Sequence, residues 1–148
     1  MQITGCTTLS FSLESRECKS WVNGADGRKT LTSEEIVAKF PDVEQRYDYA
    51  VCINKYRHPP SVYPDIFLND TDKAVPVLQS KLHLTSDVFE ITFILLAFDK
   101  MMKKGAYNVT EDKSLTLAIL EAKEKTKGTV WYSMADEIVQ SIYKTSMK

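Results

Sequence analysis

The segment from Val88 to Lys104 constrains the fold of this chain more than any other. Its residues have helical spacing, and apolar side chains occupy nearly every side of the expected helix (Val88, Phe89, Ile91, Phe93, Ile94, Leu95, Leu96 and Phe98). A helix that is apolar all round is buried in the middle of a domain. The run is interrupted by Glu90 and Thr92 and is shorter than the ~20 apolar residues of a membrane span. Other helices must therefore pack around it.

Capping residues predict further helices along the chain. Thr32 with Glu35 three residues later is a capping-box pattern, which predicts a short helix before residue 41. Ser86 and Thr110 are the expected N-caps of the helices that follow them. After Thr129, a clean apolar stripe predicts the last helix (Trp131, Met134, Ala135, Ile138 and Ile142). Helices are also expected over residues 41–57 and 70–82.

These patterns predict a mainly α fold with five or six helices. Near the N-terminus, Leu9, Phe11 and Leu13 alternate with polar residues, which is the pattern of one short strand. A chain of 148 residues is expected to form a single domain. Residues 1–30 would be an extended arm or small strand, and residues 31–148 a helical body built of stacked hairpins.

Two stretches forty residues apart read almost alike, Asp72–Val77 and Asp112–Leu117, and Val130-Trp131 echoes Val88-Phe89. Self-similarity at this period is typical of stacked helical hairpins. Residues 70–143 resemble HEAT-like repeats, and Val75–Leu78 resembles the proline-bearing first helix of that family. The resemblance implies a short solenoid, a kind of fold that usually forms a binding surface. The alternative is an irregular helical bundle.

Composition excludes several classes of function. A net charge of −1, from 19 basic and 20 acidic residues, argues against nucleic-acid binding, which calls for a basic excess. The Cys and His residues are scattered, whereas structural zinc sites need them closely spaced. No glycine-rich phosphate loop is present. We therefore expect neither a metal nor a cofactor.

The three cysteines leave two interpretations open. Ile3-Thr4-Gly5-Cys6 resembles a bacterial lipobox, which implies lipidation of Cys6 if the chain is trimmed there. In that case the protein would be an envelope lipoprotein, held to the membrane only by its lipid, and Cys18 could pair with Cys52. Otherwise the chain would be cytoplasmic and its cysteines would be free thiols, often buried.

The segment from Tyr56 to Asp65 is the best candidate for a functional site. It combines aromatic, basic and proline residues in an expected loop between helices. Binding residues concentrate on loops held by a rigid scaffold, and Tyr and Arg are favoured as interface anchors. The candidate partner-binding residues are Tyr56, Arg57, His58, Tyr63 and Asp65.

Residues 47–53 resemble the first conserved helix of type VI secretion amidase-immunity proteins. Those are small, mostly helical envelope proteins that bind and block a toxin. Our hypothesis is a non-catalytic protein-binding protein, such as a bacterial effector-immunity or inhibitor protein whose partner is a secreted toxin. Two alternatives remain: a small enzyme with a site near Cys52 and His58, and a helical structural module of a larger assembly.

Overall fold

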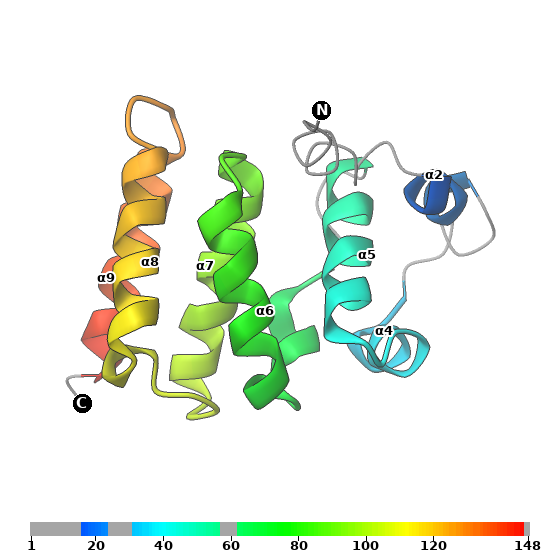
Figure 1. Ribbon diagram of the computed structural model, residues 1–148, viewed down its shortest axis with the longest axis horizontal. Helices are drawn as coiled ribbons and strands as arrows, with labels where there is room; N and C mark the ends of the chain where they lie inside the picture. The colour runs from blue at the N-terminus through cyan, green and yellow to red at the C-terminus, as the bar shows by residue number, and fades with distance from the viewer. Residues whose placement is uncertain (1–15, 24–30, 57–61, 147–148) are drawn as a thin grey trace, which may run out of the picture. The chain divides into compact units, whose positions relative to one another are not determined.

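The computed structural model describes residues 16–23, 31–56 and 62–146 (Figure 1). This part of the chain holds seven α-helices and no strand, so the predicted mainly α fold is confirmed with one helix more than expected. The alternating residues Leu9, Phe11 and Leu13 lie outside the described residues. None of the described helices is long and apolar enough to cross a membrane.

The chain divides into two compact units, Met1–Ile66 and Phe67–Lys148, where the sequence predicts one domain. In its described part, unit 1 contains the helices α2 (Arg16–Asn23), α4 (Ser33–Lys39) and α5 (Val43–Tyr56). The 3-10 turn η2 (Pro64–Phe67) follows, and its last residue is the first residue of unit 2. Unit 2 contains α6 (Thr71–Leu84), α7 (Val88–Lys103), the 3-10 turn η3 (Val109–Glu111), α8 (Lys113–Lys125) and α9 (Tyr132–Ser146). Residues 16–23, which were expected to belong to an extended arm, form helix α2 instead.

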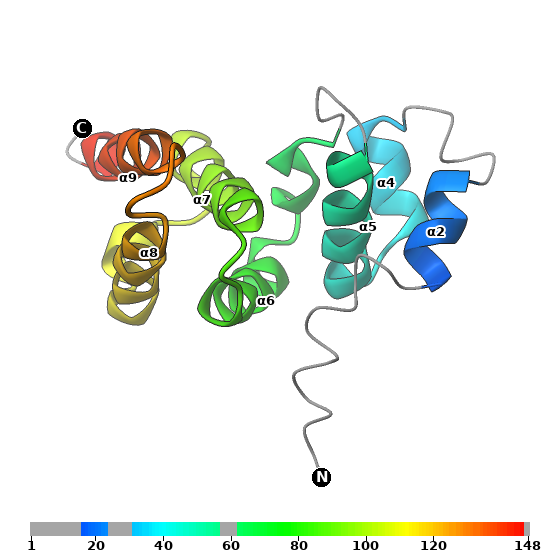
Figure 2. The same ribbon diagram turned by 90° about the horizontal axis from the view of Figure 1, so that it is seen from above.

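Unit 2 is built around α7, as the sequence predicts. The buried side chains of α7 include Ile91, Ile94 and Phe98, and Leu96 is the exposed exception at 39%. Helix α7 contacts α6, α8 and α9, and α8 in turn contacts α6 and α9. Within unit 2, α6 and α8 lie side by side in one layer, while α7 and α9 form the other (Figure 2).

Short polar side chains and a glycine set the helix boundaries of unit 2. Asp87, rather than Ser86, caps α7 by accepting hydrogen bonds from the backbone N–H groups of its first turn. Asp112, rather than Thr110, caps α8, because Thr110 belongs to η3. At the end of α7, Gly105 has a φ of 67°, a left-handed conformation that glycine adopts without a steric penalty.

The helix starts show how the two similar stretches relate. Helix α6 has its N-cap at Asp70 and α8 has its N-cap at Asp112, a spacing of 42 residues. Asp72 lies in the first turn of α6, whereas Asp112 is itself a cap. The Asp-Lys pairs forty residues apart are therefore not at equivalent positions, and the spacing of the helices matches the Val88-Phe89 and Val130-Trp131 echo instead.

Lys125 of α8 closes the C-terminal end of α6. Its Nζ donates hydrogen bonds to the backbone carbonyls of Leu82, His83 and Thr85, at 3.2, 3.0 and 2.9 Å. The last carbonyls of a helix have no partner within the helix, and a cation there also complements the helix dipole. One ammonium group thus satisfies the end of α6 and ties α6 to α8.

We predict that Lys125→Met destabilises unit 2 by about 1–2 kcal/mol, because three carbonyl groups lose a charged donor. Thermal unfolding followed by circular dichroism should show a midpoint lower by roughly 2–6 °C. Lys127→Met is the matched control, since the Lys127 ammonium pairs only with exposed Glu124 among the contacts that the structure records for it. Equal midpoints for the two variants would contradict the prediction.

In unit 1, the predicted capping box at Thr32 and Glu35 is confirmed. Arg46 of α5 is 1% exposed, and its guanidinium donates to the backbone carbonyls of Phe40, Pro41 and Ile66, at 3.0, 3.2 and 2.8 Å. A buried charge is tolerated when its donors are hydrogen-bonded. Arg46 therefore fixes the end of α4 and the turn η2 to α5.

Candidate functional site

The structure places two of the predicted binding residues on the surface of unit 1. Tyr56 is the last residue of α5 and is 52% exposed, and Tyr63 directly precedes η2 and is 63% exposed. Asp65 lies half-buried within η2. Arg57 and His58 lie outside the described residues, as does Cys6. We use the name tyrosine site for Tyr56, Tyr63 and Asp65.

Asn54 fixes the two ends of the tyrosine site to each other. Its side-chain amide donates to the backbone carbonyl of Val62 at 2.9 Å, and its Oδ1 accepts from the Val62 N–H at 2.8 Å. Asn54 is 1% exposed, so both hydrogen bonds are shielded from water. The amide of Asn54 thus pairs with Val62 as a neighbouring strand would.

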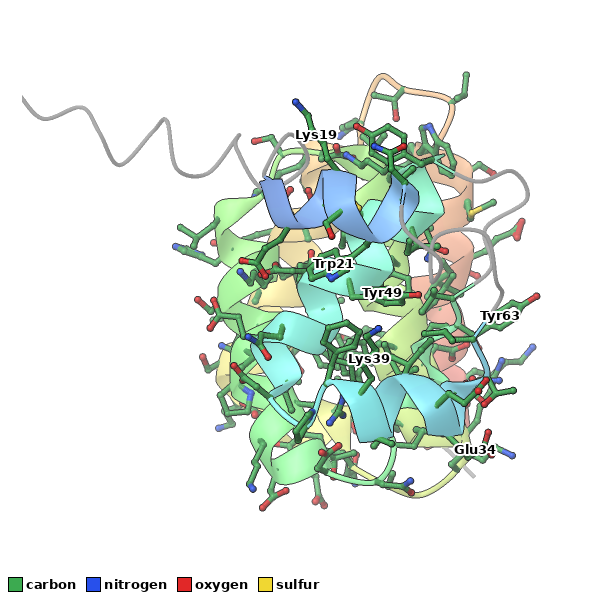
Figure 3. The ribbon with its side chains drawn as sticks, turned by 90° about the vertical axis from the view of Figure 1, so that its right-hand side faces the viewer. Lys19, Trp21, Glu34, Lys39, Tyr49 and Tyr63 are labelled. Atoms are coloured by element: carbon green, nitrogen blue, oxygen red, sulfur yellow. A yellow bond between two sulfur atoms is a disulfide. The ribbon has the colours of Figure 1, made fainter. Side chains whose placement is uncertain are left out.

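Helix α2 adds an aromatic cluster to the same unit. The ring of Trp21 packs edge-on against Phe40 and Tyr49, with centroids 5.6 and 5.4 Å apart, and Phe40 lies 4.7 Å from Tyr49. Phe40 and Tyr49 are buried, while Trp21 is half-buried. Figure 3 shows Trp21 between the exposed Lys19 and Lys39.

The sequence did not predict the packing of Trp21 on Phe40 and Tyr49, because residues 16–23 were expected to belong to an extended arm. The signal was present, since Cys18, Trp21 and Val22 have the i, i+3, i+4 spacing of one helix face. A single helical turn of such spacing is weak information on its own. The contacts that stabilise α2 come from α5, which follows it later in the chain.

A disulfide joins α2 to α5. Cys18 and Cys52 are paired with their α-carbons 5.7 Å apart, and both residues are buried, at 0% and 1% exposure. A cross-link over a sequence separation of 34 residues stabilises the fold by roughly 4 kcal/mol in the chain-entropy model. The sulfur of Cys52 is therefore not a free thiolate, which the enzyme alternative near Cys52 and His58 would need for a nucleophile.

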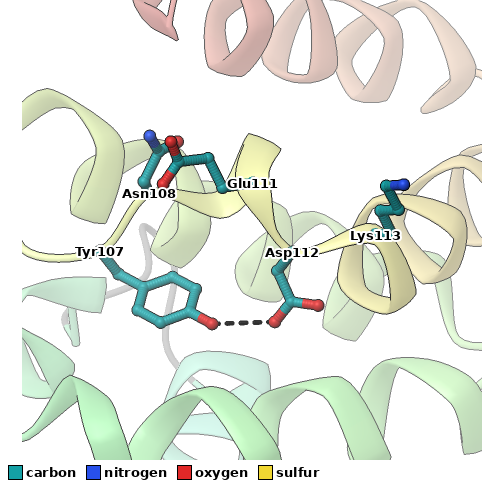
Figure 4. Close-up of a pocket in the computed structure, with 5 residues that line it drawn as sticks. All are labelled: Tyr107, Asn108, Glu111, Asp112 and Lys113. Carbon is teal, nitrogen blue, oxygen red and sulfur yellow. Dashed lines mark hydrogen bonds between the residues drawn. The ribbon is translucent and has the colours of Figure 1, made fainter.

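Unit 2 has a polar hollow of about 450 Å³ beside η3, lined by Tyr107, Asn108, Glu111, Asp112 and Lys113 (Figure 4). The Tyr107 hydroxyl donates to Oδ2 of Asp112 at 2.8 Å, while Oδ1 of Asp112 caps α8 through the Leu115 N–H at 3.1 Å. Both oxygens of this carboxylate therefore already have partners within the fold. The hydrogen bond to Asp112, together with partial burial, raises the pKa of Tyr107.

We predict that Tyr107→Phe destabilises the protein at pH 8 by about 1 kcal/mol, because Asp112 loses a donor. Since the folded state raises the pKa of Tyr107, the contribution of its hydroxyl is fully present below the ordinary value of 10.0. It is lost as the pH rises through the raised pKa. Urea unfolding should therefore show that the free energies of unfolding of Tyr107→Phe and wild type differ less near pH 11 than at pH 8.

Tyr63→Phe, at an exposed tyrosine, is the control and should match wild type at both pH values. A difference between Tyr107→Phe and wild type that stays constant, or grows, toward high pH would contradict the assigned hydrogen bond.

Comparison with known proteins gives no match: no protein-family model, no curated protein and no solved structure resembles this chain at the similarity required. Within the residues that the structure describes, no group of three or more His, Cys, Asp and Glu side chains is placed to hold a metal ion. The tyrosine site of unit 1 presents two exposed aromatic side chains next to a backbone segment that Asn54 holds in place.

Proposed function

We propose that this chain is a non-catalytic protein-binding protein and that it binds its partner through the tyrosine site of unit 1. The observation that carries the proposal is the pair of hydrogen bonds between Asn54 and Val62, which lie next to the exposed Tyr56 and Tyr63 in the chain. Tyrosine supplies a large contact area with few rotatable bonds, which makes it a favoured anchor of protein interfaces.

Preorganisation supports the same conclusion. Binding costs free energy wherever loops and side chains must be ordered, so a surface ordered beforehand binds more tightly for the same contacts. The Asn54 amide holds the chain on both sides of segment 57–61, and Arg46 holds η2 just beyond Tyr63. The backbone that carries Tyr56 and Tyr63 is therefore set before any partner arrives.

The inhibitor or immunity hypothesis gains support from the cysteines. Disulfides persist in oxidising compartments such as the bacterial envelope and are rare in the cytosol. The Cys18–Cys52 pair is therefore in keeping with an envelope protein that intercepts a secreted toxin. It also fits the lipoprotein interpretation of Cys6.

For unit 2 we propose stacked helical hairpins of the HEAT-like kind, which would serve as a scaffold. The two-layer order, with α6 beside α8 and α7 beside α9, supports this (Figure 2). So does the spacing of 42 residues between the N-caps Asp70 and Asp112, which falls within the ~40–47 residues of such repeats.

A specific observation favours one alternative, a structural module of a larger assembly. Leu117 and Leu120 of α8 lie three residues apart and are 63% and 39% exposed. Residues three apart on a helix are neighbours on its surface, so the two leucines form a small apolar spot. An assembly that buries α8 would use this spot rather than the tyrosine site.

The test is a quantitative pull-down with the tagged full chain in extract of its native host. For the double variant Tyr56→Ala/Tyr63→Ala, the amount of captured partner should fall by at least about tenfold relative to wild type. The reason is that each anchor residue contributes more than about 1 kcal/mol to binding. The matched control, Leu117→Ala/Leu120→Ala, removes exposed apolar area from unit 2 and should bind like wild type.

Circular dichroism should show that all three proteins are folded. Loss of the partner in the leucine variant alone would favour the structural module. Unchanged capture by the tyrosine variant would refute the tyrosine site as the binding surface.

A further inference from the structure

The way in which α2 is held suggests a conformational device in unit 1. Among the described side chains of α2, from Glu17 to Asn23, Cys18 alone is buried. Trp21 and Val22 are half-buried, and the remaining side chains are exposed. The helix has eight residues, and isolated helices shorter than ~12–15 residues are marginal in water. Its order therefore depends on what attaches it to α5.

A covalent bond and an aromatic contact attach α2 to the rest of unit 1. One is the Cys18–Cys52 disulfide, and the other is the edge-on packing of Trp21 against Phe40 and Tyr49. Without the covalent bond, the entropy cost of ordering these eight residues would be offset mainly by the packing of Trp21 and Val22, the half-buried side chains of α2. Phe40 and Tyr49 are 7% and 1% exposed with α2 in place.

We propose that α2 is a cover whose docking depends on oxidation of the Cys18–Cys52 pair. In the oxidised protein, α2 lies on α5 and Trp21 covers Phe40 and Tyr49. In the reduced protein, α2 leaves α5 and uncovers an aromatic face on Phe40 and Tyr49. The inference stands on the disulfide and the packing of Trp21, and it does not depend on the tyrosine site.

The reductant is a dithiol. One thiolate of the dithiol attacks a sulfur of the pair, forms a mixed disulfide and displaces the other cysteine as a thiolate. The second thiol of the reductant, as a thiolate, then attacks the mixed disulfide at the sulfur that belongs to the reductant. This step releases the second cysteine as a thiolate. Two electrons pass to the protein, the two cysteine thiolates take up the two protons that the dithiol loses, and the reductant becomes a disulfide. Because both cysteines are buried, local opening of α2 should limit the rate.

The test follows the full chain carrying Trp131→Phe, which leaves Trp21 as the only tryptophan, and Cys6→Ser, which removes the third thiol. Reduction with excess dithiothreitol is verified by mass. The Trp21 emission should shift to the red as the ring enters water, and amide exchange in residues 16–23 should quicken by at least about tenfold. Both changes should reverse on reoxidation, and Cys18→Ser/Cys52→Ser in the same background should match the reduced protein.

Amide exchange elsewhere in unit 1 shows whether the disulfide holds α2 alone or stabilises the whole unit. Amides of α4 and α5, near Ile36 and Val51, should remain protected in the reduced protein. A verified reduction that leaves the Trp21 emission and the exchange of α2 unchanged would overturn the proposal. Loss of protection throughout α4 and α5 would also overturn it, because the disulfide would then stabilise the whole unit rather than hold one helix.

Discussion

Every described segment of unit 1 is held by a side chain of α5. Arg46 binds the carbonyls at the end of α4 and in η2, Tyr49 packs against the aromatic rings, Cys52 is bonded to α2, and Asn54 pairs with Val62. These four residues lie within three turns of one helix. Without them, the short elements around α5 would have little to order them, since small helices and turns are marginal alone. Through Asn54, the backbone just before the exposed Tyr63 is bonded to the helix that ends at the exposed Tyr56.

The same residues explain why the sequence revealed the surface of unit 1 only in part. Tyr56 and Tyr63 could be proposed as binding residues from sequence, because they stand in a short segment rich in aromatic, basic and proline residues. Nothing in the sequence indicates the hydrogen-bond partners of Arg46 and Asn54. Both side chains can be buried because backbone groups outside α5 pair with them. Trp21 was missed since α2 is ordered by a cross-link that spans 34 residues.

In unit 2, prediction worked where a single physical cause dominates. The apolar circumference predicts a buried helix, and the apolar side chains of α7 from Ile91 to Phe98 are buried except for Leu96. The similar stretches at Asp72 and Asp112 were less informative, because acidic residues near helix starts are favoured locally both as caps and by the helix dipole. Their agreement reflects two helix N-termini, offset by two residues, rather than a shared site. The attachment of α6 by Lys125 has no local signal, since its partners are backbone carbonyls of another helix.

We claim that α5 preforms the tyrosine site, and amide hydrogen exchange of the free protein can measure this. The Val62 N–H lies outside the helices but is bonded to a buried side chain. It should exchange as slowly as amides in the middle of α5, and Asn54→Ala should abolish that protection while α5 stays protected. An amide of Val62 that exchanges at the rate of an exposed loop in the wild-type protein would contradict the claim.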